Sequence, residues 1–291
     1  MYINKTTLQV TLKSDYAVNV GKWTSSMLRG AIKSALAHQH CTSLQYENCN
    51  KCRYEDCPNK FLFDRKEIGC GTIQANLVIL DAPFYDEDEI TDTLDFKVII
   101  FENLCDEVDI LRELFTSGIR MGKPRVLWHA TKFIEDEEQI DFPEYTPNSD
   151  KVSSCVIKFE TPIVSNKLLE IRGCKLTPEN LVKVMTVRLA GIANMAELGY
   201  EVPYKQLIED SKDYVIDKTG LSKIQMCRKS TTKNRIDTVT ANIGELKLIG
   251  KLDSLHPFLK LISHLNIGKE CTMGLGKFSV SELDYGDGSG T

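Results

Sequence analysis

The chain has 291 residues, of which 42% are hydrophobic and 26% are charged, so it has the composition of a globular protein long enough for two cores. It contains no run of about 18 uncharged apolar residues, so we expect no membrane span and no membrane partner. The N-terminal residues also lack the apolar run of a secretory signal, and we therefore expect a cytoplasmic protein.

The net charge is −5, which argues weakly against nucleic acid, but the acids are unevenly distributed. Residues 86–95 hold six acids and no base, and residues 134–150 hold seven acids and no base. The other 28 acids are outnumbered by all 36 lysines and arginines, so the rest of the chain is basic. Acidic segments on a basic body are compatible with an RNA-binding face.

Two stretches of the chain, residues 1–133 and 152–285, follow one plan. In the first, the strand LQVTLKSD leads to a helix at about 24–38, and FKVIIF leads to a helix at 108–115, a glycine-rich basic loop and a final strand. In the second, SCVIKFETPI leads to a helix at about 178–197, and LKLIG leads to a helix at 257–265, a glycine-rich loop and a strand. We therefore predict an α+β protein with two tandem ferredoxin-like, RRM-like βαββαβ domains.

The sequence also predicts the linker between the two domains, the C-terminal tail and the start of one helix. Residues 134–151 are acidic and contain prolines, so we predict a linker between the domains. Residues 286–291, GDGSGT, are expected to form a flexible tail. In the second domain, Thr177, Pro178 and Glu179 predict the start of a helix. Within that apolar helix, Arg188 is expected to be a surface or capping arginine.

Cys41, Cys49, Cys52 and Cys57 form a C-x7-C-x2-C-x4-C cluster, predicted as an insertion in the first domain. Disulfides are disfavoured in a cytosolic protein, and four clustered thiolates suit tetrahedral zinc. The local sequence is polar and rich in turn residues, so a metal would order it. We expect a structural zinc ion with no catalytic role, and an iron–sulfur cluster or free thiols remain as alternatives.

The glycine-rich loops carry basic residues in both domains. The second contains Gly268, Lys269, Gly274, Gly276 and Lys277. Successive amides in such a loop can bind phosphate oxygens, although a plain helix-to-strand connection would also use glycines. The corresponding segment of the first domain, residues 118–125, contributes Arg120, Lys123 and Arg125, so we predict both loops as RNA contacts. A polar segment that leads into a strand adds further predicted backbone contacts, Arg228, Lys229, Lys233 and Arg235.

The closing pattern IGKECTMGLGKFSV resembles the C-terminal glycine motif of Cas6, the CRISPR repeat-RNA processing endoribonuclease. MLRGAIKSAL (27–36), FETPIV (159–164) and the cysteine segment followed by FLFDR (61–65) resemble segments of one branch of that family. The resemblance spans most of the chain, although each motif is short. It implies two ferredoxin-like domains and cleavage of CRISPR repeat RNA, or pre-crRNA, that needs no metal and leaves a 2′,3′-cyclic phosphate.

Such a cleavage needs a base for the 2′-hydroxyl, and histidine is the usual choice. On a helix over 24–40, His40 lies within roughly 40° of Arg29 and Lys33, at about 100° per residue. We therefore predict His40 as the base, with His38 as the alternative and Tyr16 as a group that orients phosphate or donates a proton. The resemblance points to the same helix. His40 also adjoins Cys41, so a flanking or ligating role at the metal site remains open.

The other histidines are given structural interpretations: a sheet face for His129, the start of a helix for His256 and the end of a helix for His264. The leading functional prediction is an endoribonuclease. The alternatives are a non-catalytic RNA-binding subunit of a CRISPR effector complex, with other effector subunits as partners, and a zinc-stapled module whose acidic segments bind a basic protein.

Overall fold

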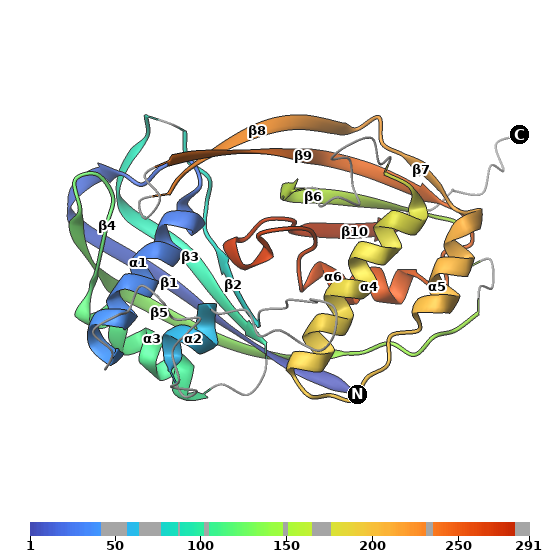
Figure 1. Ribbon diagram of the computed structural model, residues 1–291, viewed down its shortest axis with the longest axis horizontal. Coiled ribbons are helices and arrows are strands. Elements are labelled where there is room, and N and C mark those ends of the chain that lie inside the picture. The colour runs from blue at the N-terminus through green and yellow to red at the C-terminus, as the bar shows by residue number, and fades with distance from the viewer. Residues whose placement is uncertain are drawn as a thin grey trace, which may run out of the picture.

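A computed structural model describes residues 1–41, 57–63, 77–86, 88–101, 105–147, 151–164, 176–230 and 235–282 (Figure 1). The N-terminal domain contains β1 (Tyr2–Asn19), α1 (Thr24–His40), α2 (Pro58–Phe63), β2 (Val78–Asp81), β3 (Ile90–Phe101), α3 (Cys105–Ser117), β4 (Ile119–Met121) and β5 (Val126–Asp141). Its antiparallel sheet has the order β2-β3-β1-β5-β4. Apart from the short β4, this is the strand order of a ferredoxin-like domain.

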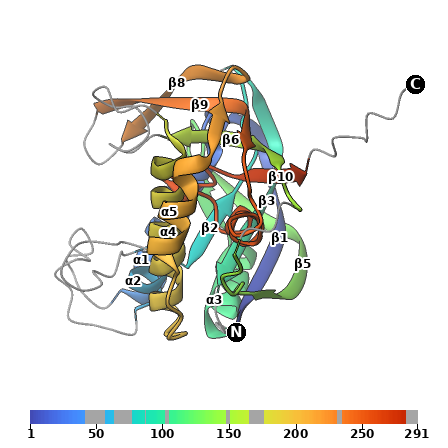
Figure 2. The ribbon, with the colours of Figure 1, turned by 90° about the vertical axis from the view of Figure 1, so that its right-hand side faces the viewer.

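The C-terminal domain contains β6 (Ser154–Val164), α4 (Pro178–Met195), α5 (Tyr204–Asp210), η2 (Ser211–Asp213), β7 (Val215–Asp217), β8 (Leu221–Ser230), β9 (Arg235–Ile249), α6 (His256–Ser263), η3 (Cys271–Met273) and β10 (Phe278–Glu282). Its antiparallel sheet has the order β10-β6-β9-β7, and β8 also pairs with β9. The second half therefore repeats the topology of the first, as the sequence predicts. Figure 2 shows α4 and α5 packed side by side in this domain.

Local sequence explains where the longest helices form. The Thr177 side chain accepts the Asn180 amide at 3.3 Å, and Pro178 is the first residue of α4, so the predicted helix start is confirmed. In α1, Leu28, Ile32 and Leu36 recur at helical spacing and are buried. They pack in one core with alternate residues of β1, among them Leu8 and Leu12.

A second core joins the two domains. It contains Ile3, Phe101 and Ile140 from the N-terminal sheet together with the apolar faces of α4 and α6. Because these buried residues come from both halves of the chain, the two domains pack through a continuous apolar interface.

The predicted linker begins too early. Residues 134–141 continue β5 and pair with β1 from Gln9 back to Tyr2, so the connection between the sheets covers only residues 142–153. Glu135, Asp136, Glu137 and Glu138 are all exposed, so this part of the strand carries no alternation of buried and polar side chains. The cysteine-rich residues 42–56 lie outside the described residues.

Candidate nucleic-acid interface

The helix α1 carries the predicted catalytic histidines in its last turn. His38 and His40 are both exposed there, and Arg29 and Lys33 are half-buried on earlier turns. Lys33 precedes His40 by seven residues, a rise of roughly 10 Å along the helix axis. The helix therefore reaches His40 and presents it to solvent, on the side of the helix that the sequence predicts for it.

The third predicted catalytic residue lies elsewhere. Tyr16 is on β1, in the stretch where the pairing with β3 shifts register, and its side chain is 69% exposed. It precedes the first turn of α1, whereas His40 ends the helix roughly 24 Å from Thr24. Tyr16 thus belongs to β1, before α1 begins, whereas His40 is the last residue of α1.

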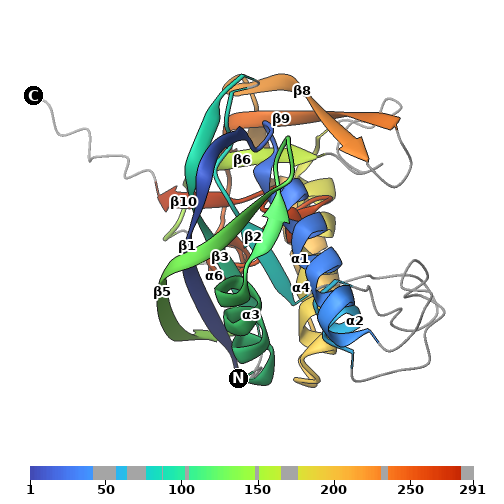
Figure 3. The same cartoon turned by 90° about the vertical axis from the view of Figure 1, so that its left-hand side faces the viewer.

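Beside α1, the short strand β4 and the turn after it expose three predicted RNA contacts. Arg120, Lys123 and Arg125 are all exposed. β4 contacts α1, as Figure 3 shows, and Lys123 pairs with Asn19 at the end of β1. Gly122 has φ +89°, and a Cβ there would lie 2.6 Å from Val18 Cγ2. The turn therefore packs tightly against β1 while its cations face the solvent beside α1.

The hairpin β8–β9 extends from the C-terminal sheet to the start of α1. Met226 of β8 and Ala241 of β9 share a small core with Trp23, which directly precedes α1. The predicted cations of this hairpin lie toward its tip: Arg228 and Lys229 in β8, Arg235 in β9, and Lys233 among the residues outside the description. The backbone thus places this basic segment beyond the contact with Trp23.

The C-terminal glycine-rich loop is mostly buried between the domains. Gly268, Gly274 and Gly276 all have positive φ, at +96°, +73° and +71°. A Cβ at Gly274 would lie 2.7 Å from the Leu80 carbonyl oxygen, and a Cβ at Gly276 would lie 1.7 Å from the Ile267 carbonyl oxygen. Close backbone approach therefore accounts for these glycines.

The two lysines of this loop, Lys269 and Lys277, differ in their exposure and in their charged neighbours. Lys269 is exposed. The Lys277 Nζ lies 3.1 Å from Asp81 Oδ2 and 3.3 Å from Glu160 Oε2. Burial lowers the pKa of Lys277, but the two carboxylates outweigh it and raise that pKa above its ordinary value. Of the two, only Lys269 presents its charge to solvent without a carboxylate partner in the described contacts.

The cysteine cluster is described in part. Cys41 is the C-cap of α1 and Cys57 directly precedes α2, and both side chains are half-buried. α1 and α2 contact each other, so the two ends of the predicted zinc segment belong to packed helices. Cys49 and Cys52 lie outside the described residues, and within the described part of the chain no group of three or more metal-ligating side chains gathers.

The remaining three histidines, His129, His256 and His264, lie on a strand or at the ends of a helix. His129 is exposed on β5 with Nδ1 3.3 Å from the Thr116 carbonyl oxygen, as expected for a sheet-face residue. His256 is the first residue of α6, and burial chiefly lowers its pKa. His264 is the C-cap of α6, and burial followed by the charge of Lys5 lowers its pKa.

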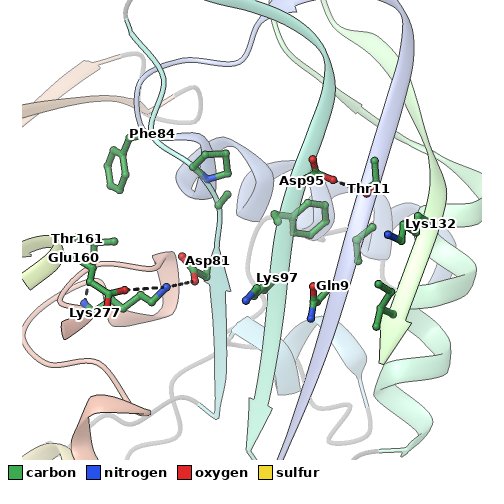
Figure 4. A pocket seen from close by; sticks show the side chains of 15 residues that line it. Gln9, Thr11, Asp81, Phe84, Asp95, Lys97, Lys132, Glu160, Thr161 and Lys277 are labelled. Carbon is green, nitrogen blue, oxygen red and sulfur yellow. Dashed lines mark hydrogen bonds and ion pairs between the residues drawn. The ribbon is translucent and has the colours of Figure 1, made fainter. Parts of the chain in front are cut away.

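Sequence reasoning missed a groove between the domains with a volume of about 540 Å³ (Figure 4). Its N-terminal wall is the sheet face opposite α1 and carries Gln9, Thr11, Lys97 and Lys132. Its other wall includes Glu160 and Lys277, and Phe84 lies at its edge. The signal in the sequence is the alternation of polar Gln9 and Thr11 with apolar Leu8, Val10 and Leu12 in β1.

Comparisons with known proteins agree with this fold. Residues 157–278 match the family model described as CRISPR-associated endoribonuclease Cas6, and residues 3–123 match an N-terminal domain model, AF_1859_N. Comparison with curated protein sequences finds no significant match.

Among solved structures, a Cas6 product complex aligns with a TM-score of 0.58 at 10% identity, covering 95% of this chain and 100% of that chain. A second Cas6 product complex aligns with a TM-score of 0.54 at 11% identity, covering 97% and 100% of the two chains. Cas6 of Thermus thermophilus aligns with a TM-score of 0.50 at 11% identity, covering 95% and 98%. At these identities the structural matches show a shared fold.

Proposed function

We propose that this chain is a Cas6-type endoribonuclease that processes CRISPR repeat RNA. The observation that carries the proposal is the match of residues 157–278 to the family model named for that activity. The exposed cations of β4 and its turn beside α1 support it, because they supply a basic surface on a chain whose net charge is negative.

The reaction proposed is transesterification within the RNA. The 2′-oxygen attacks the adjacent phosphorus, the bond from phosphorus to the 5′-oxygen breaks, and the products are a 2′,3′-cyclic phosphate and a 5′-hydroxyl. A base removes the proton of the 2′-hydroxyl and an acid protonates the leaving 5′-oxygen. No metal ion is required in this proposal.

His40 is proposed as the base and His38 as the alternative. His40 is exposed at the end of α1 and can therefore reach a bound RNA without rearrangement of the core. Arg29 and Lys33 lie on earlier turns of the same helix, roughly 16 and 10 Å from His40 along its axis, and are proposed to bind neighbouring phosphates of the RNA. Tyr16, on β1, is proposed to act on a different part of the RNA from His40.

The RNA backbone is proposed to cross the surface made by α1, the β4 turn and the tip of the β8–β9 hairpin. Arg120, Lys123 and Arg125 are exposed on this side of the molecule, and Lys269 adds an exposed cation in the C-terminal domain. Contacts of this kind go to phosphate, so they position the RNA and contribute little to sequence specificity.

A structural zinc ion bound by Cys41, Cys49, Cys52 and Cys57 is proposed for the segment that connects α1 to α2. The two described ligands border helices that contact each other, which fits a closed site that anchors the end of α1. Other CRISPR proteins are proposed as partners. A partial complex named Cas6-RT-Cas1–Cas2 contains a chain of which this fold covers 47%, with a TM-score of 0.50 at 16% identity.

The test is incubation of the purified protein with labelled CRISPR repeat RNA in excess EDTA, resolved on a denaturing gel. We expect one cut, blocked by a 2′-deoxy group at the cut position. His40→Ala should abolish the cut and leave RNA binding unchanged, whereas His129→Ala, an exposed histidine on β5, should cut normally. Cutting by His40→Ala at the normal rate would show that His40 is not the base.

A non-catalytic RNA-binding subunit is the second candidate. The observation that favours it is that no described contact joins Tyr16, on β1, to His40, at the end of α1, because a catalytic set needs its members around one phosphate. RNA that is retarded on a native gel and stays intact would support this candidate. A zinc-stapled module that binds a basic protein is the third, and absence of both RNA binding and cutting would favour it.

A further inference from the structure

We propose that the C-terminal glycine-rich loop is an interdomain clasp that positions α1, and that Lys277 acts as a positioning residue and makes no contact with RNA. The second half of this inference concerns the reaction and rests on the proposed function. The first half, the clasp, can be tested without RNA.

Four amides of the loop already donate to acceptors within the protein. The amides of Met273 and Gly274 donate to carbonyl oxygens within the loop, at 2.9 and 3.0 Å. The Gly276 amide donates to the Pro162 carbonyl oxygen at 3.0 Å, and the Lys277 amide donates to Thr161 Oγ1 at 2.9 Å. A phosphate-binding loop needs amides that point at the ligand, and these four point at protein acceptors.

The same loop packs against the start of α1. The Trp23 indole Nε1, just before the helix, donates to the Met273 carbonyl oxygen at 3.1 Å in a buried hydrogen bond. Ser25, in the first turn of α1, is 1% exposed, and its Oγ lies 3.4 Å from the position of a Cβ on Gly274. The first turn of α1 is therefore enclosed by a loop from the other domain.

The strand β2 completes this enclosure. Ser25 Oγ accepts the Ala82 amide at 3.1 Å, so α1 is fastened to the end of β2. Asp81, the preceding residue, pairs with Lys277 at 3.1 Å. Lys277 thus links Glu160 of its own domain, at 3.3 Å, to Asp81, whose neighbour Ala82 bonds Ser25 of α1.

Thr161 fixes the ends of the loop to each other. Its hydroxyl donates to the Gly274 carbonyl oxygen at 2.7 Å and accepts the Lys277 amide at 2.9 Å. This arrangement holds Lys277 beside Asp81, and the side chain of Asp81 is only 16% exposed. A displacement of Lys277 would therefore be transmitted to β2 and, through Ala82 and Ser25, to α1.

The clasp is tested first by a double-mutant cycle of urea unfolding without RNA. We expect Asp81→Asn and Lys277→Met each to lower the unfolding midpoint, and the double variant to lower it no further than the worse single variant. Lys277→Arg should retain the midpoint, because a guanidinium can pair with both carboxylates. Additive losses, or no loss in either single variant, would overturn the clasp.

The role toward RNA is tested by cleavage and by the salt dependence of the dissociation constant. Asp81→Asn and Lys277→Met should both slow single-turnover cleavage about tenfold or more, since misplacement by about 1 Å can cost about 100-fold. Neither should change the slope of log K against log salt. Lys269→Met, in the same loop, is the comparison and should reduce that slope by about 0.7, the value for one phosphate contact on a single strand.

Direct binding of phosphate by Lys277 would give different results in the same two assays. If Lys277 binds phosphate, Lys277→Met reduces the salt slope, and Asp81→Asn tightens RNA binding because a nearby negative charge is removed. Either outcome would overturn the positioning role. If the wild-type protein neither binds nor cuts repeat RNA, the proposed function fails, and the unfolding cycle still decides whether the clasp exists.

Discussion

Replacement of Gly276 by Ala gives the sharpest test of the loop geometry. Gly276 has φ +71°, and a Cβ there would lie 1.7 Å from the Ile267 carbonyl oxygen and 3.1 Å from the Ile267 amide nitrogen. A left-handed backbone conformation costs an alanine about 1 to 2 kcal/mol. Relief of the clash must move buried backbone, for which an overpacking cost of about 1 to 3 kcal/mol is expected. We therefore expect Gly276→Ala to lower the free energy of unfolding by about 2 to 5 kcal/mol.

The matched control is Gly199→Ala. Gly199 also has positive φ, at +63°, but no atom lies within 4 Å of a Cβ built there. Its cost should be limited to the backbone term of about 1 to 2 kcal/mol. The assay is urea unfolding of the two variants and the wild type, followed by fluorescence. Equal losses for both variants would refute the argument that close approach to Ile267, and not conformation alone, requires glycine at position 276.

Three further outcomes are expected. Arg188→Met should lower the unfolding midpoint more than Lys183→Met on the same helix. The reason is that Arg188 Nε and Nη2 donate to the Leu265 carbonyl oxygen at 3.1 and 3.0 Å. Equal midpoints for the two variants would contradict this role of Arg188. Burial lowers the pKa of His256, so the unfolded state binds the proton first as the pH falls. The free energy of unfolding should therefore decrease as the pH drops below the ordinary value of 6.5. This decrease should be shallower in His256→Gln, and an equal decrease in that variant would contradict the argument. Metal analysis should find one zinc per chain, lost in Cys52→Ser and retained in Cys227→Ser, and a metal-free wild type would remove the zinc proposal.

The order of the elements could be predicted from the sequence because it depends on local patterns. Helical spacing of apolar residues identified α1 and α4, and Thr177 with Pro178 marked where α4 begins. Arg188 was expected to be a surface or capping arginine, and the structure shows it part-buried with its guanidinium on the carbonyl oxygen of Leu265, just after α6. The carbonyl that it caps lies 77 positions away along the chain, and no local pattern identifies such a partner.

The linker was predicted wrongly because charge was taken as a sign of a loop. Residues 134–141 are held in β5 by backbone pairing with β1, which requires no apolar side chain. Apolar alternation appears in a strand when one of its faces is buried. Glu135 and Glu138 are exposed on a strand that carries its charges to solvent, so the periodicity that marks the other strands is missing here.

The glycine loop shows why a motif can be found in a sequence while its contacts cannot. Gly274 and Gly276 belong to one motif and both have positive φ. Gly274 lies against the Leu80 carbonyl oxygen of the other domain, whereas Gly276 lies against Ile267 of its own domain. Sequence alone could not separate a lysine that faces solvent, Lys269, from one that pairs with Asp81. The distinction depends on a contact between residues 196 positions apart, which forms only when the two domains pack. Because that contact occupies the charge of Lys277, we expect this lysine to contribute little to RNA binding, and we place the proposed RNA surface at the exposed cations beside α1.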